Sequence, residues 1–197
     1  MSDDVQRFDR WSKRYEDFWG QRYLDSLHNL MLDLTAAEAP NLNPTAILDV
    51  GCGTGRLLRR VATRWPAAQL IGVDPAQGMV EVAQRLTPAA TFHQAFAESV
   101  PLGDNSVDLV LSAVSMHHWS DAWLGTREVE RVLRGGGLFC LADISLPTWL
   151  SKLLRSKAKN RPGTRDLLVQ SGFQVGRQQG TFAGFVLVSV GVKSAPQ

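Results

Sequence analysis

The stretch that decides the fold runs from Ala46 to Leu58 and reads AILDVGCGTGRLL. Its first part, Ala46–Val50, is a short apolar run after Pro44, which predicts a buried strand. Alternate glycines follow the strand, and apolar residues then recur at helical spacing. A strand, a glycine loop and a helix let backbone N–H groups approach a ligand closely, and the helix dipole favours an anionic group. We therefore expect this stretch to bind a ligand.

The spacing of the glycines narrows the kind of ligand. The dinucleotide fingerprint is G-x-G-x-x-G, whereas Gly51, Gly53 and Gly55 are followed by Arg56, so the pattern here is G-x-G-x-G. Asp49 stands two residues before the first glycine. A carboxylate at that place would repel a pyrophosphate and can face a cationic or hydroxylated part of a ligand. The pattern favours a ligand loop over an ordinary turn.

At these residues the chain resembles a family. The segment DVGCGTG resembles the first motif of class I S-adenosylmethionine (SAM)-dependent methyltransferases, and it is most similar to the broad group that contains the quinone-biosynthesis methyltransferases. The segment IGVDPAQGMV, from residue 71, is similar to the family's second motif, and EVERVLRGGGL, from residue 128, continues the match. The resemblance covers roughly residues 8–193. It implies SAM as cofactor and S-adenosylhomocysteine (SAH) as product.

Strand-like and helix-like segments alternate along the chain, which by itself predicts an α/β fold with an open parallel sheet. The expected strands are 46–50, 69–73, 90–94, 107–113, 138–143, 173–180 and 185–192. The resemblance implies a doubly wound, Rossmann-like sheet of seven strands in the order 3-2-1-4-5-7-6, with strand 7 antiparallel. We expect one domain over 1–197, with N-terminal helices in 1–40 that form a lid or pack on the core, and a core sheet over 44–193.

The resemblance also implies the cofactor-binding residues. Asp74 follows the second strand and suits the ribose hydroxyls, although a helix N-cap is the other interpretation. Phe96 stands where the family commonly has a small acidic or polar residue, so either Phe96 stacks on adenine or the backbone near Ala97 binds it. Met79 either packs on adenine or belongs to the core. The expected set is Tyr15, Asp49, Gly51, Cys52, Gly53, Gly55, Asp74, Pro75, Met79, Phe96, Ala97 and Ser112.

Two histidines, His117 and His118, follow the fourth strand, where the reacting groups of open α/β sheets lie. We expect the catalytic residues to be among these two histidines. If the acceptor is a hydroxyl, one imidazole is a base; if it is an activated carbon, the pair only shapes the pocket. Trp11, Trp19, Trp119 and Trp149 are expected near the strand ends, which predicts a small, apolar or aromatic acceptor.

Other classes are disfavoured by the composition. A net charge of +2 does not imply nucleic acid, and the fourth strand lacks the Asn-Pro-Pro-Tyr type motif of amino-methylating enzymes. The two cysteines lack metal-ligand spacing, so no metal is expected. No apolar run reaches 18 residues and no signal peptide is visible, so we expect a cytoplasmic protein without stable membrane insertion. The oligomeric state stays open.

Two alternatives to a methyltransferase remain. A short-chain nicotinamide-dependent reductase needs Tyr-x-x-x-Lys after the fourth strand, but the only tyrosines are Tyr15 and Tyr23. A SAM-binding protein that acts through a partner without catalysis carries the same cofactor motifs, so the sequence leaves that alternative open.

Overall fold

The computed structural model describes residues 3–17, 20–145 and 163–195. The N-terminal half of the chain contains α1 (Asp3–Tyr15), α2 (Gln21–Glu38), β1 (Ala46–Val50), α3 (Arg56–Arg64), β2 (Gln69–Asp74), α4 (Gln77–Leu86) and β3 (Thr91–Gln94). The other half contains β4 (Val107–Ala113), the 3-10 helix η1 (Met116–His118), α5 (Ala122–Val132), β5 (Leu133–Ile144), α7 (Thr164–Gln170), β6 (Phe173–Thr181) and β7 (Val186–Lys193).

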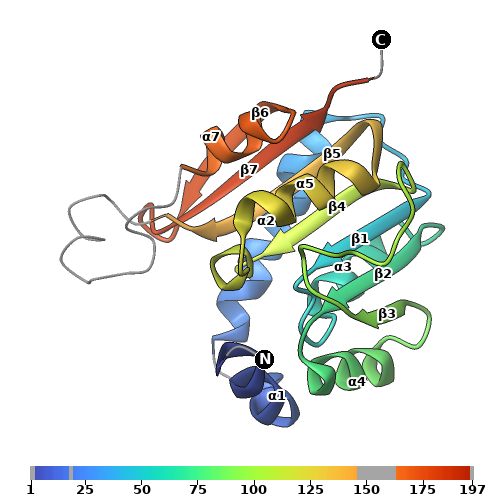
Figure 1. Ribbon diagram of the computed structural model, residues 1–197, viewed down its shortest axis with the longest axis vertical. Coiled ribbons are helices and arrows are strands. Elements are labelled where there is room, and N and C mark those ends of the chain that lie inside the picture. The colour runs from blue at the N-terminus through green and yellow to red at the C-terminus, as the bar shows by residue number, and fades with distance from the viewer. Residues whose placement is uncertain (1–2, 18–19, 146–162, 196–197) are drawn as a thin grey trace.

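The seven strands form one sheet in the order β3-β2-β1-β4-β5-β7-β6 (Figure 1). Strands β1 to β5 pair in parallel, and β7 runs antiparallel to both of its neighbours. The expected fold class, strand order and direction of the last strand are therefore confirmed. Every residue of β1 is buried, as the continuous apolar run predicts for a central parallel strand.

Helices cover both faces of the sheet. On one face, Leu27 and Met31 of α2 and Leu58 of α3 pack against the strands. On the other face, Val129 of α5 and Leu168 of α7 form a second buried cluster, and Figure 1 shows these two helices in front of the sheet. This arrangement leaves the carboxyl ends of the parallel strands to be covered by loops and by α1.

Helix α1 packs against α4 beyond those strand ends (Figure 1). Val5 of α1 and Met79 of α4 belong to a small apolar cluster, and Asp9 accepts a hydrogen bond from the Gly78 N–H at 2.6 Å. A Cβ atom at Gly78 would lie 2.6 Å from the Ser12 hydroxyl, so the close approach of the two helices needs a glycine there. The N-terminal helix therefore lies over the cofactor-motif side of the fold.

Strand β5 is longer than the sequence predicts. Helix α5 ends at Val132, and the glycines that follow belong to a strand that begins at Leu133, whereas the sequence predicts a strand that begins at Leu138. Leu133 pairs with Val107, and the register of the pairing shifts before Leu138 pairs with Leu109. The glycine run marks an irregular strand rather than a turn.

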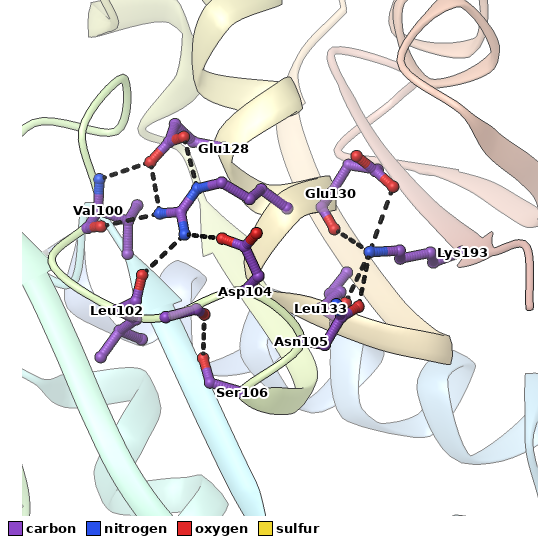
Figure 2. Close-up of polar contacts among 11 residues, drawn as sticks. Val100, Leu102, Asp104, Asn105, Ser106, Glu128, Glu130, Leu133 and Lys193 are labelled. Atoms are coloured by element: carbon purple, nitrogen blue, oxygen red, sulfur yellow. Dashed lines mark hydrogen bonds and ion pairs between the residues drawn. The ribbon is translucent and has the colours of Figure 1, made fainter. Parts of the chain in front are cut away.

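An ion-pair network holds the loop before β4 against α5 and β7. The guanidinium of Arg131 donates to the Glu128 and Asp104 carboxylates and to the carbonyls of Val100 and Leu102 (Figure 2). The Lys193 ammonium donates to the Glu130 and Leu133 carbonyls at 2.7 and 2.8 Å (Figure 2). The Arg131 bonds fix the segment that follows Phe96 and Ala97 and so help to hold that loop in place, whereas these two Lys193 bonds join β7 to α5 and β5.

Candidate active site

The glycine loop has the backbone that only glycine adopts readily. Gly51, Gly53 and Gly55 have φ angles of 73°, 51° and 76°. A Cβ atom at Gly51 would also collide with the Ser115 side chain. The N–H groups of Gly51 and Cys52 donate to the Val73 carbonyl at 2.8 and 3.0 Å, which joins the loop to β2. The sequence motif therefore reflects both turn geometry and close packing.

Asp74 ends β2 beside this loop. Its carboxylate accepts hydrogen bonds from the N–H groups of Gly53 and Ala76, each at 2.9 Å. Burial raises the pKa of Asp74 to about 6, and the two backbone bonds oppose that shift. The N-cap of α4 is Ala76, so the interpretation of Asp74 as that N-cap is wrong.

Asp49 is a second buried carboxyl group at the same sheet edge. Its side chain is 2% exposed, and burial, followed by the nearby charge of Asp74, raises its pKa to about 8. Asp49 is one residue before the end of β1 and shares a face of the strand with Ile47, which packs toward α2 and α3. The Asp49 carboxyl therefore lies on the α2 side of the glycine loop.

Two cavities meet at the glycine loop. The first, which we name the Asp74 cavity, has about 800 Å³ of empty space, including space open to solvent, and is lined by Asp74, Pro75, Met79, Phe96 and Ala97, together with residues of α1. The second, the Asp49 cavity, has about 920 Å³ of empty space, also partly open to solvent, and is lined by Asp49, Cys52, Thr54, Arg56, His28 and His117, among others. The residues common to both are Phe8, Tyr15, Gly51, Gly53, Ala113, Val114 and His118. The cavities therefore adjoin across the carboxyl ends of β1 and β4.

Most of the expected cofactor residues lie on these walls, but two do not. Ser112 is fully buried and bonds through its hydroxyl to Ser115 at 2.8 Å. Gly55 is the N-cap of α3, and a Cβ atom there would lie 3.0 Å from Phe92. These two residues lie behind the cavity walls, where they support β4 and the glycine loop. Phe96, at 44% exposed, stands at the mouth of the Asp74 cavity, whereas Met79 is 2% exposed and forms its inner wall.

The residue at the end of β4 has unusual backbone geometry. Val114 lines both cavities and has a φ angle of 52°, which is rare for a β-branched residue. The next residue, Ser115, holds this segment in place because its hydroxyl bonds to the Val50 carbonyl at 3.0 Å. Backbone strain of this kind is typical of functional sites, where the surrounding contacts maintain it.

His117 is oriented by a carboxylate that the sequence analysis missed. Its Nδ1 lies 2.7 Å from Asp143 Oδ1, and its backbone N–H donates to Asp143 Oδ2 at 2.8 Å. Asp143 is 2% exposed, near the end of β5. A carboxylate oxygen accepts, so Nδ1 carries the proton and Nε2 keeps its lone pair. In the sequence, the signal for this contact was a single aspartate in the apolar run that forms β5.

His118 lies beside His117, and its ring is held by α1. The centres of the two imidazoles are 3.9 Å apart, and His118 Nδ1 lies 3.2 Å from an Asp4 oxygen. The Phe8 ring meets the His118 ring edge-on at 5.1 Å. Burial and then the neighbouring His117 lower the pKa of His118, although Asp4 opposes the shift. The pair therefore contains one imidazole fixed by the sheet and one fixed by the N-terminal helix.

A cluster of charges joins the N-terminal helices to α3. Glu16 accepts hydrogen bonds from Thr54, from Arg56 and from Arg59, the last two at 2.8 Å. Asp25 of α2 pairs with Arg56, whose guanidinium donates to both of its oxygens at 2.8 and 3.0 Å. Sequence reasoning did not detect these partners, since they come from segments separated by 31 residues or more. Arg56, which replaces the last glycine of the dinucleotide fingerprint, ties α1 and α2 to the glycine loop.

Two kinds of feature are absent from residues 3–17, 20–145 and 163–195. No helix in those ranges combines the length and apolar character needed to cross a bilayer. Nor do those residues group three or more His, Cys, Asp or Glu side chains as a metal site would. Cys52 and Cys140 are both buried and free.

Comparison with known proteins shows similarity to methyltransferases. Residues 48–141 match the family model described as a methyltransferase domain. A malonyl-[acyl-carrier protein] O-methyltransferase from Dechloromonas aromatica is 29% identical over 185 residues, which are 94% of this chain and 66% of the relative. A demethylmenaquinone methyltransferase from Chlorobaculum parvum is 34% identical over 101 residues, which are 51% of this chain and 42% of the relative. The chain thus spans at most about two thirds of the length of these relatives.

The solved structures agree at the level of the fold. A chain of the complex that contains the Haloferax volcanii Trm112 methyltransferase activator superposes with a TM-score of 0.76 at 19% identity, covering 95% of this chain and 97% of that chain. At that identity the likeness concerns the fold alone. Together with the motifs and the methyltransferase-domain match over residues 48–141, it leads to one conclusion: this chain is similar to SAM-dependent methyltransferases in sequence and in fold.

Proposed function

We propose that this protein transfers a methyl group from SAM to a small-molecule acceptor and releases SAH. The observation that carries the proposal is the pair of cavities that adjoin across Gly51 and Gly53. One cavity has the acidic and apolar walls that suit a nucleoside, and the other combines charged groups with a histidine oriented by a carboxylate. A single ligand that occupies both cavities would have its central part beside the carboxyl end of β4.

The residues present fit SAM. Gly51 and Gly53 leave space that a side chain would fill, and their positive φ angles form a cradle for a ligand. Asp74 supplies buried carboxylate oxygens for the ribose hydroxyls, and Met79, Phe96 and Ala97 supply apolar walls for adenine. Asp49, Cys52 and Tyr15 line the part of the site on the glycine-loop side. Gly55 and Ser112 support the loop and strand from behind.

Bound SAM supplies a methyl group that its sulfonium already makes electrophilic. The chain then has to align the acceptor and exclude water. Helix α1 covers the strand ends with Phe8 and Tyr15, which line both cavities. Correct alignment lowers a reaction barrier by roughly 7–11 kcal/mol. We propose that α1 and α2 act as the expected lid, within a single domain over 1–197.

The acceptor we propose is an apolar or aromatic molecule that reacts through a hydroxyl. Trp11 lines the Asp49 cavity and Trp119 lines the Asp74 cavity, whereas Trp19 and Trp149 lie outside the described residues. His117 accepts the hydroxyl proton at Nε2, while the bond from Nδ1 to Asp143 stabilises the imidazolium that forms. His118 shapes the wall. The relative named as an O-methyltransferase supports oxygen as the acceptor atom. We also propose that the protein is located in the cytoplasm.

The proposal is tested by following SAH formation while the purified protein is incubated with SAM and a pool of metabolites. A product 14 mass units heavier than its acceptor is expected, on the mass of one added CH₂ group. SAM binding without SAH formation in any pool would instead support a non-catalytic SAM-binding protein.

The role of His117 is tested with that acceptor. His117→Asn should lower kcat by roughly 10²–10⁴ while the Kd for SAH stays unchanged, because general-base catalysis contributes about that factor. Asp143→Asn should lower kcat in the same direction, since the imidazole loses its orienting carboxylate. His93→Asn is the control, because His93 lies on β3 and lines neither cavity. A loss below about tenfold for His117→Asn would leave alignment as the mechanism and an activated carbon as the acceptor.

A further inference from the structure

One residue of the cavity walls has a backbone conformation that its own side chain disfavours. Val114, at the carboxyl end of β4, has a φ angle of 52°, and the branched Cβ atom makes this region more costly for valine than for most residues. Among the described residues, the other non-glycine residues with positive φ angles, Asn105, Phe182 and Ala183, lie in exposed turns. Glycine would adopt the same angle without strain. The presence of valine therefore indicates that the side chain itself matters at this position.

Hydrogen bonds from several elements hold the backbone around Val114. The Val114 N–H donates to the Ala142 carbonyl of β5 at 2.7 Å. The hydroxyl of the next residue, Ser115, donates to the Val50 carbonyl of β1 at 3.0 Å and accepts from the Trp119 indole at 3.3 Å. Because these bonds come from β5, from β1 and from the residue after η1, they keep Val114 in its strained conformation.

Val114 lies where the Asp74 cavity and the Asp49 cavity meet. The other residues from the carboxyl ends of β1 and β4 that line both cavities are small, namely Gly51, Gly53 and Ala113. Val114 is half-buried, and its side chain packs on the edge of the core cluster that α2 and α3 cover. Val114 thus contributes the one branched side chain by which this edge of the sheet narrows the junction of the two cavities.

We infer that the isopropyl group of Val114 limits the alkyl group on the sulfonium of the bound ligand to the size of a methyl group. The inference rests on the proposed function, because a ligand that occupies both cavities has its sulfur beside the end of β4. Closely packed sites tolerate an added CH₂ group poorly, and one methylene changes binding by about 10- to 200-fold in a pocket that excludes it. Val114 therefore selects methyl over ethyl and takes no part in the bond-forming step.

Two ligands that differ by one CH₂ group test this size limit. SAM and S-adenosyl-L-ethionine carry the same sulfonium charge. In isothermal titration of the wild-type protein, the Kd for the ethyl compound should be at least about tenfold higher than the Kd for SAM. Val114→Ala removes two methyl groups, so the two Kd values should then lie within about threefold of each other. Val192→Ala is the matched control, because Val192 of β7 is also half-buried but lines neither cavity, and it should keep the wild-type ratio.

Enlarging the side chain gives a second measurement. Val114→Ile adds one CH₂ group and should raise the Kd for SAM roughly tenfold, whereas the Kd for SAH, which has no methyl group on sulfur, should change less than about threefold. Equal weakening of SAM and SAH would instead mean that the substitution disturbs the whole site and would contradict the inference.

Thermal unfolding measures the strain. Val114→Gly and Val192→Gly lose the same half-buried side chain, but only the first relieves a positive φ angle. Val192→Gly should lower the Tm by about 5 °C or more, and Val114→Gly should lower it by less than half that amount. An equal fall in both variants would show that Val114 is unstrained and would remove the basis of the inference.

Three results of the titrations would overturn the inference. Equal Kd values for SAM and the ethyl compound in the wild type would show that no size limit exists. A wild-type ratio in Val114→Ala would assign the limit to another residue, and loss of both ligands in a folded Val114→Ala would give Val114 a structural role. A wild-type protein that binds neither SAM nor SAH would overturn the proposed function itself, a result that is recognised without any variant.

Discussion

At the scale of single residues, the site depends on carboxyl groups kept away from water. Asp74 has two backbone N–H donors, whereas Asp49 has no side-chain hydrogen bond to the described residues and is the more costly of the two to ionise. Asp143 is as buried as Asp49 but is paired with His117. The three aspartates therefore suit different interactions. Asp74 can accept hydrogen bonds from hydroxyl groups, Asp49 can face a cation, and Asp143 orients the His117 imidazole.

The ionisation of Asp49 should make the stability of the ligand-free protein fall as pH rises. The folded state holds a proton on this carboxyl up to a pKa of about 8, whereas the unfolded state releases it near the ordinary value of 3.8. Between those values the folded state binds more protons, so the free energy of unfolding decreases by up to ~1.4 kcal/mol per pH unit. Asp49→Asn has no such proton, and its stability relative to the wild type should increase from pH 5 to pH 8.

Chemical denaturation at the two pH values measures this difference. Asp17→Asn is the control, since Asp17 is exposed, and it should track the wild type at both pH values. If Asp49→Asn differs from the wild type by the same amount at pH 5 and pH 8, Asp49 is already ionised in the folded protein.

At the scale of elements, helix α1 is held from two sides. Its inner face packs on α4 through Val5 and Met79, and its carboxyl end is tied to α3 through Glu16. The sequence analysis predicts helices within residues 1–40, and the structure has α1 and α2 there. The spacing could not reveal Glu16 as the connection, because a charge on a helix end has no partner until tertiary packing brings α3 beside it.

Removing this connection should loosen the cover over the site without unfolding the sheet. Glu16→Gln loses its ion pairs with Arg56 and Arg59, which are about one quarter exposed. Such partly exposed pairs contribute on the order of 1 kcal/mol, so amide exchange in α1 should accelerate roughly fivefold while the core strands keep their protection. Hydrogen exchange with mass spectrometry measures both regions.

The matched control is Asp33→Asn, which breaks the pair between Asp33 and Arg64 at the other end of the α2–α3 contact. The Asp33 side chain is 70% exposed, so exchange in α1 should not change. Acceleration spread evenly over β1 and β4 in Glu16→Gln would mean that the charge cluster stabilises the whole fold rather than the cover.

At the scale of the whole molecule, the fold was predictable where the signal was local. The central strands, the glycine loop and the carboxylate after β2 follow from short runs of sequence, and the strand order follows from the resemblance to the family. The start of β5 was not predictable, because the glycines that usually mark a turn here lie in a strand paired with β4. The contact between His117 and Asp143 also depends on two strands that meet only in the folded sheet.

In other proteins a sheet of this kind binds nicotinamide cofactors at the same edge. Comparing the binding of SAH and of NADH therefore tests how this site differs from the site in those proteins. Asp49 and Asp74 both lie at the glycine loop, and their carboxyl groups would repel a pyrophosphate while they suit an ammonium group and ribose hydroxyls. SAH at 100 times its Kd should therefore stabilise the protein by ~2.7 kcal/mol and raise its Tm by roughly 5–10 °C, whereas NADH should leave the Tm within about 1 °C of its starting value. Asp74→Ala should lose much of the SAH effect at the same ligand concentration, because a charge-assisted bond contributes ~1.5–3 kcal/mol. An equal rise in Tm with NADH would contradict SAM as the proposed ligand and would indicate that the glycine loop binds a dinucleotide.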